Sequence, residues 1–233
     1  MKSLALSVRQ CLFGLRDICA KRPELLIFTV LIGLANFGIL LGTPFQSLAF
    51  VPEQVQQGEW WRVVTHPLVH VTWYHLLLDG AAFLTLYASL MEKSLARRLG
   101  YVVAAAAGSF LLSWAAAPNP AAGLCGLSGI AHGLMAISAW EFIKGSRSGT
   151  VERRIGWISF ALVATKAAFE ALTGRMFFAF LDFGLLGTPV AVSHAGGIIG
   201  GLVAVLILNR YEAANTRIDN PLGKLECTRA MRP

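Results

Sequence analysis

The sequence predicts an all-α, polytopic membrane protein built as a bundle of six transmembrane helices. Hydrophobic residues make up 55% of the 233 residues, charged residues make up only 14%, and the mean hydropathy is +0.60. Soluble domains contain about a quarter charged residues, so this composition favours a membrane protein. The apolar residues gather into segments near the ~20 residues that a helix needs to cross a ~30 Å hydrocarbon core. These segments lie at about 25–42, 74–92, 101–117, 128–143, 155–173 and 190–209.

The basic residues predict how this bundle is oriented. All of the 20 lysines and arginines except Arg62, Lys166 and Arg175 fall in the two chain ends and in the connections after the second and fourth segments. Cytoplasmic loops carry an excess of Lys and Arg, so both termini are predicted to be cytoplasmic. The expected organisation is a tail at 1–24, a membrane domain at 25–210 and a second tail at 211–233.

The net charge of +7 raises the choice between lipid and nucleic acid as a partner. A nucleic-acid-binding domain gathers its basic residues on one soluble face. Here the basic residues flank apolar segments, which indicates contact with the anionic headgroups of a lipid bilayer. We therefore expect the bilayer as a partner and no nucleic acid.

The connection 43–73 between the first two apolar segments is long and rich in aromatic and aliphatic residues. It includes Trp60 and Trp61, and tryptophan concentrates at the interface between membrane and water. Two interpretations stay open at this point. The connection either lies in the outer headgroup region or forms a hydrophobic cap over the bundle.

A glycine-rich turn from Gly123 to Gly133 places Ser128 at the start of the fourth apolar segment. A serine hydroxyl is a poor nucleophile until a neighbouring base removes its proton, and neutral imidazole does this near pH 7. His194, near the start of the sixth segment, is the candidate base. The backbone N–H of Ser128 has no acceptor within its own helix and is therefore suited to stabilise a developing oxyanion.

Counting along the helices predicts that these two side chains meet. Ser128 lies 16 residues before Lys144, and His194 lies 16 residues before Arg210. At 1.5 Å per residue, both lie about 24 Å above their cytoplasmic anchors and about 6 Å below the outer hydrocarbon boundary. Small-x-x-x-small faces beside them let helix backbones approach closely. The glycine pairs are Gly129 with Gly133, Gly196 with Gly200, and Gly197 with Gly201.

Other polar residues of the apolar segments receive separate interpretations. His75 and Asp79 are one turn apart on one helix face and are expected to line the same cavity. Lys166 and Glu170 are also one turn apart and are interpreted as a mutually satisfied structural pair. Cys125, beside the serine, is interpreted as a packing residue rather than a second nucleophile.

The five histidines also require a metal site to be considered. They all fall on the predicted outer side of the membrane: His66, His70, His75, His132 and His194. Histidine clusters are common metal ligands. Apart from His75 and Asp79, no single segment combines histidine with an acidic ligand at helical spacing, so we expect no metal.

The motifs around these residues resemble those of the rhomboid family of intramembrane serine proteases. The stretch Gly126-Leu127-Ser128-Gly129 matches the family's Gly-x-Ser-Gly nucleophile motif, and His194 with Gly197 and Gly201 resembles its His-x-x-Gly-x-x-x-Gly helix. Trp61-Arg62 is similar to the Trp-Arg of the family's first outer loop. His66 and His70 through His75 and Asp79 resemble its second-helix pattern of histidines followed by an asparagine. The similarity runs from about Glu59 to Leu208.

The resemblance implies a Ser–His dyad without an acidic third member, acting without metal, nucleotide or other cofactor. The substrates would be membrane-anchored proteins, cleaved in or near a transmembrane segment. Ser128 is then the nucleophile, His194 the general base and acid, and His75 an oxyanion donor, with Asp79, Gly126 and His132 lining the site. The expected location is the bacterial inner membrane, with the site opening to the periplasm. The resemblance implies no particular oligomeric state.

Two departures from the family pattern leave alternatives open. Asp79 stands where the family has asparagine, and it donates a hydrogen bond only when protonated. His132 stands where the family has an aromatic residue packed on the base, so it either stacks similarly or competes as a base. This histidine, the short chain and the short first loop resemble the rhombosortase branch, which processes bacterial surface proteins bearing a C-terminal Gly-Gly, a helix and a basic tail.

Two other functions remain as alternatives. The first is a catalytically inactive rhomboid-like protein that binds transmembrane clients, for which Asp79 is the best support. The second is a histidine-lined conduit for metal ions or protons.

Overall fold

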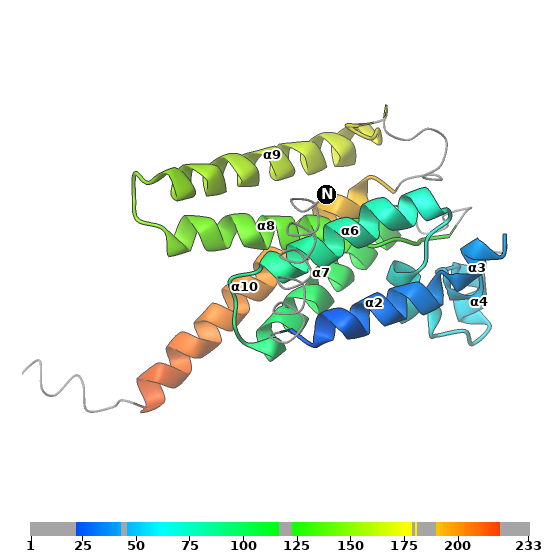
Figure 1. Ribbon diagram of the computed structural model, residues 1–233, viewed down its shortest axis with the longest axis horizontal. Coiled ribbons are helices and arrows are strands. Elements are labelled where there is room, and N and C mark those ends of the chain that lie inside the picture. Colours follow the sequence, from blue (N-terminus) through cyan, green and yellow to red (C-terminus); the bar gives the residue numbers. More distant parts are fainter. Residues whose placement is uncertain (1–21, 43–45, 117–122, 179, 181–189, 220–233) are drawn as a thin grey trace, which may run out of the picture.

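The computed structural model describes residues 22–42, 46–116, 123–178, 180 and 190–219, and this part of the chain is almost entirely helical (Figure 1). A helix overlaps each of the six predicted segments, which confirms the all-α fold class. These helices are α2 (Glu24–Ala35) followed by α3 (Phe37–Leu40), α6 (Trp73–Ser89), α7 (Leu95–Ala116), α8 (Ser128–Gly145), α9 (Val151–Thr173) and α10 (Val192–Asp219). Residues 1–21 and 220–233, which hold most of the two predicted tails, lie outside the described residues, so the domain boundaries stay a prediction.

The predicted count of six spans is not exact. Among the described helices, α7, α9 and Val192–Glu212 of α10 are long and apolar enough to cross a membrane, which makes the chain an integral membrane protein. The first predicted segment is divided, because α2 has only 12 residues and ends at Asn36. The Asn36 amide donates to the carbonyl oxygens of Ile32, at 2.8 Å, and Leu68, at 2.6 Å. Such side-chain bonds to the backbone compete with continuation of a helix.

Glycine contacts bring α10 against α7 on one face and α8 on another. A Cβ atom added at Gly197 would collide with the carbonyl oxygen of Gly129 in α8. A Cβ atom added at Gly196 would collide with the carbonyl oxygen of Gly108 in α7. The small-x-x-x-small faces therefore bring these helices together, as their spacing predicts. In Figure 1, α10 passes across the bundle and α9 lies beside α8.

The long outer connection folds into four short helices that are fixed to the bundle. These are η1 (Gln46–Leu48), α4 (Pro52–Gln56), α5 (Arg62–Thr65) and η2 (His66–Leu68). The buried Arg62 donates to the carbonyl oxygen of Ala49 at 2.7 Å. Phe50 exchanges two backbone hydrogen bonds with Leu124, of 3.0 and 2.9 Å, so the connection pairs with the segment that leads to Ser128.

Both interpretations of this connection describe part of it. Phe50 is 2% exposed and packs edge-on against Phe110 of α7, with 4.8 Å between ring centroids, as expected of a cap. Trp60 and Trp61 are 69% and 49% exposed, as expected of residues at a lipid headgroup region. The connection therefore caps the bundle and directs two tryptophans outward.

Candidate active site

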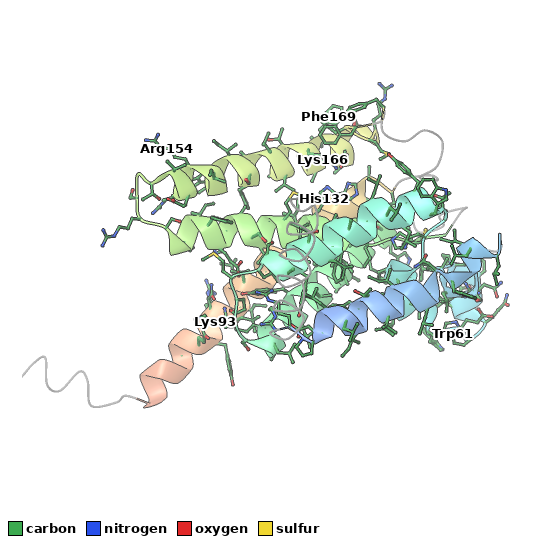
Figure 2. The ribbon with its side chains drawn as sticks, viewed as in Figure 1. Trp61, Lys93, His132, Arg154, Lys166 and Phe169 are labelled. Atoms are coloured by element: carbon green, nitrogen blue, oxygen red, sulfur yellow. The ribbon has the colours of Figure 1, made fainter. Side chains whose placement is uncertain are left out.

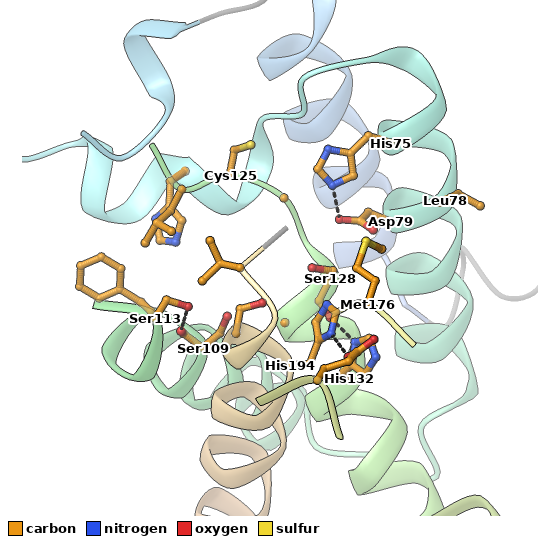
Figure 3. Close-up of a pocket in the computed structure, with 18 of the residues that line it drawn as sticks. His75, Leu78, Asp79, Ser109, Ser113, Cys125, Ser128, His132, Met176 and His194 are labelled. Carbon is orange, nitrogen blue, oxygen red and sulfur yellow. Dashed lines mark hydrogen bonds and ion pairs between the residues drawn. The ribbon is translucent and has the colours of Figure 1, made fainter. Parts of the chain in front are cut away.

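A cavity of about 270 Å³ lies between α6, α8, α9, α10 and the outer connection (Figure 3). All six residues that the sequence predicts for the site line it: His75, Asp79, Gly126, Ser128, His132 and His194. The structure therefore gathers residues that are more than 100 positions apart in the chain around one space. Lys166 and Glu170 of α9 also line this cavity, and the sequence analysis assigned them no place in the site.

Ser128 is the first residue of α8, and the turn before it depends on glycine. Gly126 has a φ of +99°, a conformation that favours glycine. A Cβ atom there would lie 3.0 Å from both His75 Nε2 and Asp79 Oδ2. Gly126 therefore lets the turn approach α6 closely. In Figure 3 the Ser128 side chain points toward the imidazole of His194.

The start of α8 offers backbone donors to the cavity. The N-cap residue Leu127 makes no side-chain cap hydrogen bond, and its own side chain is apolar. The first N–H groups of a helix have no intrahelical acceptor, and the helix dipole is positive at this end. The N-terminus of α8 is therefore suited to hold negative charge beside Ser128.

His194 is buried, and one face of its imidazole is fixed by α9. Its Nδ1–H donates to Oε2 of Glu170 at 2.6 Å. A neutral imidazole protonated at Nδ1 carries its acceptor lone pair on Nε2. The contact with Glu170 therefore leaves Nε2 as the basic atom of His194.

His132 stacks on His194 and has both ring nitrogens engaged. The two ring centroids are 3.9 Å apart, and Nδ1–H of His132 donates to the carbonyl oxygen of Ser128 at 2.7 Å. The ammonium of Lys166 donates to Nε2 of His132 at 2.9 Å, and Figure 2 shows these two residues facing each other between α8 and α9. A histidine with both nitrogens occupied is a poor base, so the geometry favours stacking over the competing role.

His75 and Asp79 face each other on α6, as their one-turn spacing predicts. Oδ2 of Asp79 lies 3.2 Å from Nε2 of His75 and 3.7 Å from Nε2 of His70. The His75 side chain is 12% exposed and that of Asp79 is 13% exposed, so both lie on the inner cavity wall. Asp79 therefore accepts a proton of His75 where the family's asparagine would offer its own donor.

Two buried groups just outside the spans are electrically neutral at physiological pH. Burial lowers the pKa of His66 to about 4, although the carbonyl of Val63 accepts its Nδ1–H at 3.0 Å. Burial, with a smaller effect of the Asp79 charge, raises the pKa of Cys125 to about 11. A protonated thiol is a weak nucleophile, which agrees with Cys125 as a packing residue.

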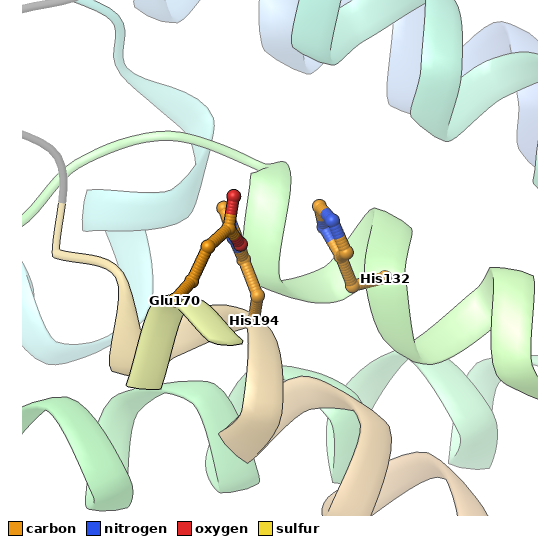
Figure 4. A group of neighbouring side chains, drawn as sticks. All are labelled: His132, Glu170 and His194. Carbon is orange, nitrogen blue, oxygen red and sulfur yellow. The ribbon is translucent and has the colours of Figure 1, made fainter. Parts of the chain in front are cut away.

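Glu170 is the site residue that the sequence analysis missed. The predicted pair with Lys166 is present, with Nζ 2.8 Å from both carboxylate oxygens, but the pair is not isolated. Glu170 lies beside His194 on the side away from His132 (Figure 4). A sequence signal existed, because Glu170 lies 16 residues beyond Arg154, the same count that placed Ser128 near the outer surface.

Three of these side chains also have the composition of a metal site. His132, Glu170 and His194 each offer one ligand atom, and these atoms lie within 4.8 Å of one another. The Lys166 ammonium already lies among them, 2.9 Å from Nε2 of His132 and 2.8 Å from the carboxylate. Its positive charge disfavours a second cation at the same place.

Comparison with protein families matches residues 57–211 to the Rhomboid domain, which is more than half of the chain. A helical integral membrane protein with this site and this match is a member of the class of intramembrane proteases. The chain belongs to the rhomboid family. Comparison with curated proteins finds no matching relative.

Proposed function

We propose that this chain is an intramembrane serine endopeptidase that uses Ser128 and His194 as its dyad. The observation that carries this proposal is the position of His194. Its Nδ1–H is held by Glu170, so Nε2 is the basic atom in the cavity toward which Ser128 points. A hydroxyl beside a neutral imidazole is the arrangement that acyl transfer requires.

In the proposed reaction, Ser128 Oγ attacks the carbonyl carbon of the scissile peptide while Nε2 of His194 takes the hydroxyl proton. The carbonyl oxygen becomes an oxyanion, held by N–H groups at the start of α8 and by His75. The C–N bond then breaks, and the imidazolium returns its proton to the leaving amine. A water molecule attacks the acyl-enzyme with His194 again as base, which releases the acid product and restores Ser128.

The proposed substrates are membrane-anchored proteins cleaved in or near a transmembrane segment. Backbone groups inside lipid are normally bonded within a helix, so a segment that unwinds easily is the better substrate. Figure 2 places Trp61 at one end of the molecule and Lys93 and Arg154 at the other. This separation supports cytoplasmic termini and a site open to the periplasm, and we propose the bacterial inner membrane as the location.

The test is covalent labelling of the purified protein in detergent with a serine-reactive fluorophosphonate, followed by mass spectrometry of the adduct. We expect an adduct on Ser128 and cleavage of a membrane-tethered reporter, both lost in Ser128→Ala and His194→Ala. Ser148→Ala, in the exposed connection between α8 and α9, is the matched control and should behave as the native chain does. A folded native protein that takes no label while transmembrane segments still copurify with it would favour the inactive client-binding alternative.

A narrower proposal concerns the substrate. His132 stacked on His194 is the residue that links this chain to the rhombosortase branch, so we propose C-terminal Gly-Gly anchored surface proteins as substrates. A reporter with Gly-Gly, a helix and a basic tail should be cleaved faster than the same reporter with Leu-Leu. Equal rates would contradict this choice of substrate without affecting the proposed dyad.

A further inference from the structure

We propose that Glu170 is a positioning residue that makes the site a Ser128–His194–Glu170 relay rather than a dyad. This inference rests on the proposed function. Its basis is the 2.6 Å contact between His194 Nδ1 and Glu170 Oε2, made between two different helices. Glu170 is only 1% exposed, so this contact is shielded from solvent.

The carboxylate is held in place by donors on both of its oxygens. Oε1 accepts from the backbone N–H of Phe177 at 3.0 Å and from Lys166 at 2.8 Å. Oε2 accepts from His194 and, at 2.8 Å, from Lys166. A buried carboxylate needs such compensation, and Lys166 supplies the balancing charge. The group is therefore an ionised acceptor in a fixed orientation.

A fixed acceptor at Nδ1 has two consequences for His194. It selects the tautomer that keeps Nε2 free to take a proton, and it stabilises the imidazolium that forms when the proton arrives. Because Glu170 contacts His194 and not the reacting atoms, its effect passes entirely through the imidazole. The stacked ring of His132 holds the opposite side, so His194 is constrained from two directions.

Replacing Glu170 with glutamine sharply tests this role. Both carboxylate oxygens face donors, so the amide nitrogen of a glutamine must face a donor whichever way it is turned. When that nitrogen faces His194, it favours the tautomer whose Nε2 is already protonated. In soluble triads the equivalent change from Asp to Asn lowers kcat by about 10⁴-fold. Here, with Lys166 sharing the carboxylate, we expect a loss of at least about tenfold.

The experiment compares three proteins with the native chain. Glu170→Gln tests the charge, and Lys166→Met/Glu170→Gln removes both charges, so that no unpaired ammonium is left to impair folding. Glu152→Gln, an exposed position at the other end of α9, is the matched control. The measurements are kcat and KM for reporter cleavage, the rate of fluorophosphonate labelling at Ser128, and the thermal unfolding midpoint.

A positioning role predicts that kcat and the labelling rate fall together, by about tenfold or more, while KM changes by less than about twofold. The double variant should show the same loss with an unfolding midpoint close to the native value. A purely structural role predicts instead that the folded double variant labels at the native rate, and that result would overturn the proposal. A native chain that neither cleaves nor labels would overturn the proposed function and this inference together.

A metal bound by His132, Glu170 and His194 is the competing account, and a further arm decides it. If a zinc chelator abolishes labelling of the native protein and added Zn²⁺ restores it, Glu170 acts as a metal ligand and the positioning role is wrong. Labelling that is unchanged by the chelator supports the relay.

Discussion

The imidazole planes of His132 and His194 lie 15° from parallel with 3.9 Å between their centroids. The two residues come from helices α8 and α10, and the stack forms although each has separate polar partners. Lys166 and the Ser128 carbonyl fix His132, and Glu170 fixes His194. The stack therefore joins two hydrogen-bonded systems into one wall of the cavity.

The first prediction concerns this stack. A phenylalanine at position 132 keeps an aromatic face against His194, whereas alanine removes it. Aromatic pairs contribute about 0.5–1.5 kcal/mol, so His132→Ala should lower kcat by roughly threefold to tenfold. His132→Phe should lower it less, as measured by reporter cleavage. If His132→Phe were the more damaged variant, the ring nitrogens of His132 would take part directly.

The second prediction concerns the contact between α8 and α10. Gly197→Ala places a methyl group against the carbonyl oxygen of Gly129, a backbone atom that cannot rotate away. Overpacking of this kind costs about 1–3 kcal/mol or more, so the thermal unfolding midpoint in detergent should fall clearly. Gly33→Ala is the matched helical control, because a Cβ atom there meets nothing within 4 Å. Equal behaviour of the two variants would contradict the close glycine contact.

The third prediction concerns the pH dependence of stability. The pKa of His66 is about 4 in the folded protein, against 6.5 for an unperturbed histidine. Between these values the unfolded chain binds the extra proton, so the free energy of unfolding rises with pH and is lost as pH falls from about 6.5 toward 4. The loss from this group is at most about 3 kcal/mol.

His66→Asn tests that assignment, because the asparagine amide can still donate to the Val63 carbonyl but does not titrate. The difference between unfolding midpoints at pH 7.5 and pH 5 should be smaller in the variant than in the native protein. An unchanged difference would mean that other groups cause the acid sensitivity.

The sequence was sufficient for the parts of this molecule that depend on local pattern and chain geometry. Apolar segments gave the all-α class, and helical rise placed Ser128 and His194 at one depth. The glycine faces then gave the right pairing of α8 and α10, since two backbones can approach closely only where side chains are absent.

What escaped prediction depends on which way helices are rotated. Nothing in the spacing of Lys166 and Glu170 says which neighbour their shared face meets, so they were interpreted as a pair that satisfies itself. The rotation of α9 brings that face to His132 and His194. The division of the first segment was missed for a similar reason, since the Asn36 amide finds its second acceptor at Leu68, in the outer connection.

The last prediction concerns a buried ion pair outside the proposed site. Arg98 of α7 donates through Nε to Oε1 of Glu24 at 3.0 Å, and both side chains are at most 8% exposed. Glu24→Gln leaves the guanidinium uncompensated and should cost about 3–5 kcal/mol of unfolding free energy. Glu24→Gln/Arg98→Met should cost less, because no unpaired charge stays buried. Glu212→Gln removes the exposed partner of Arg97 and should cost less than about 1 kcal/mol. If Glu24→Gln were no more damaging than Glu212→Gln in denaturant titrations, the pair would not hold the start of α2 to α7.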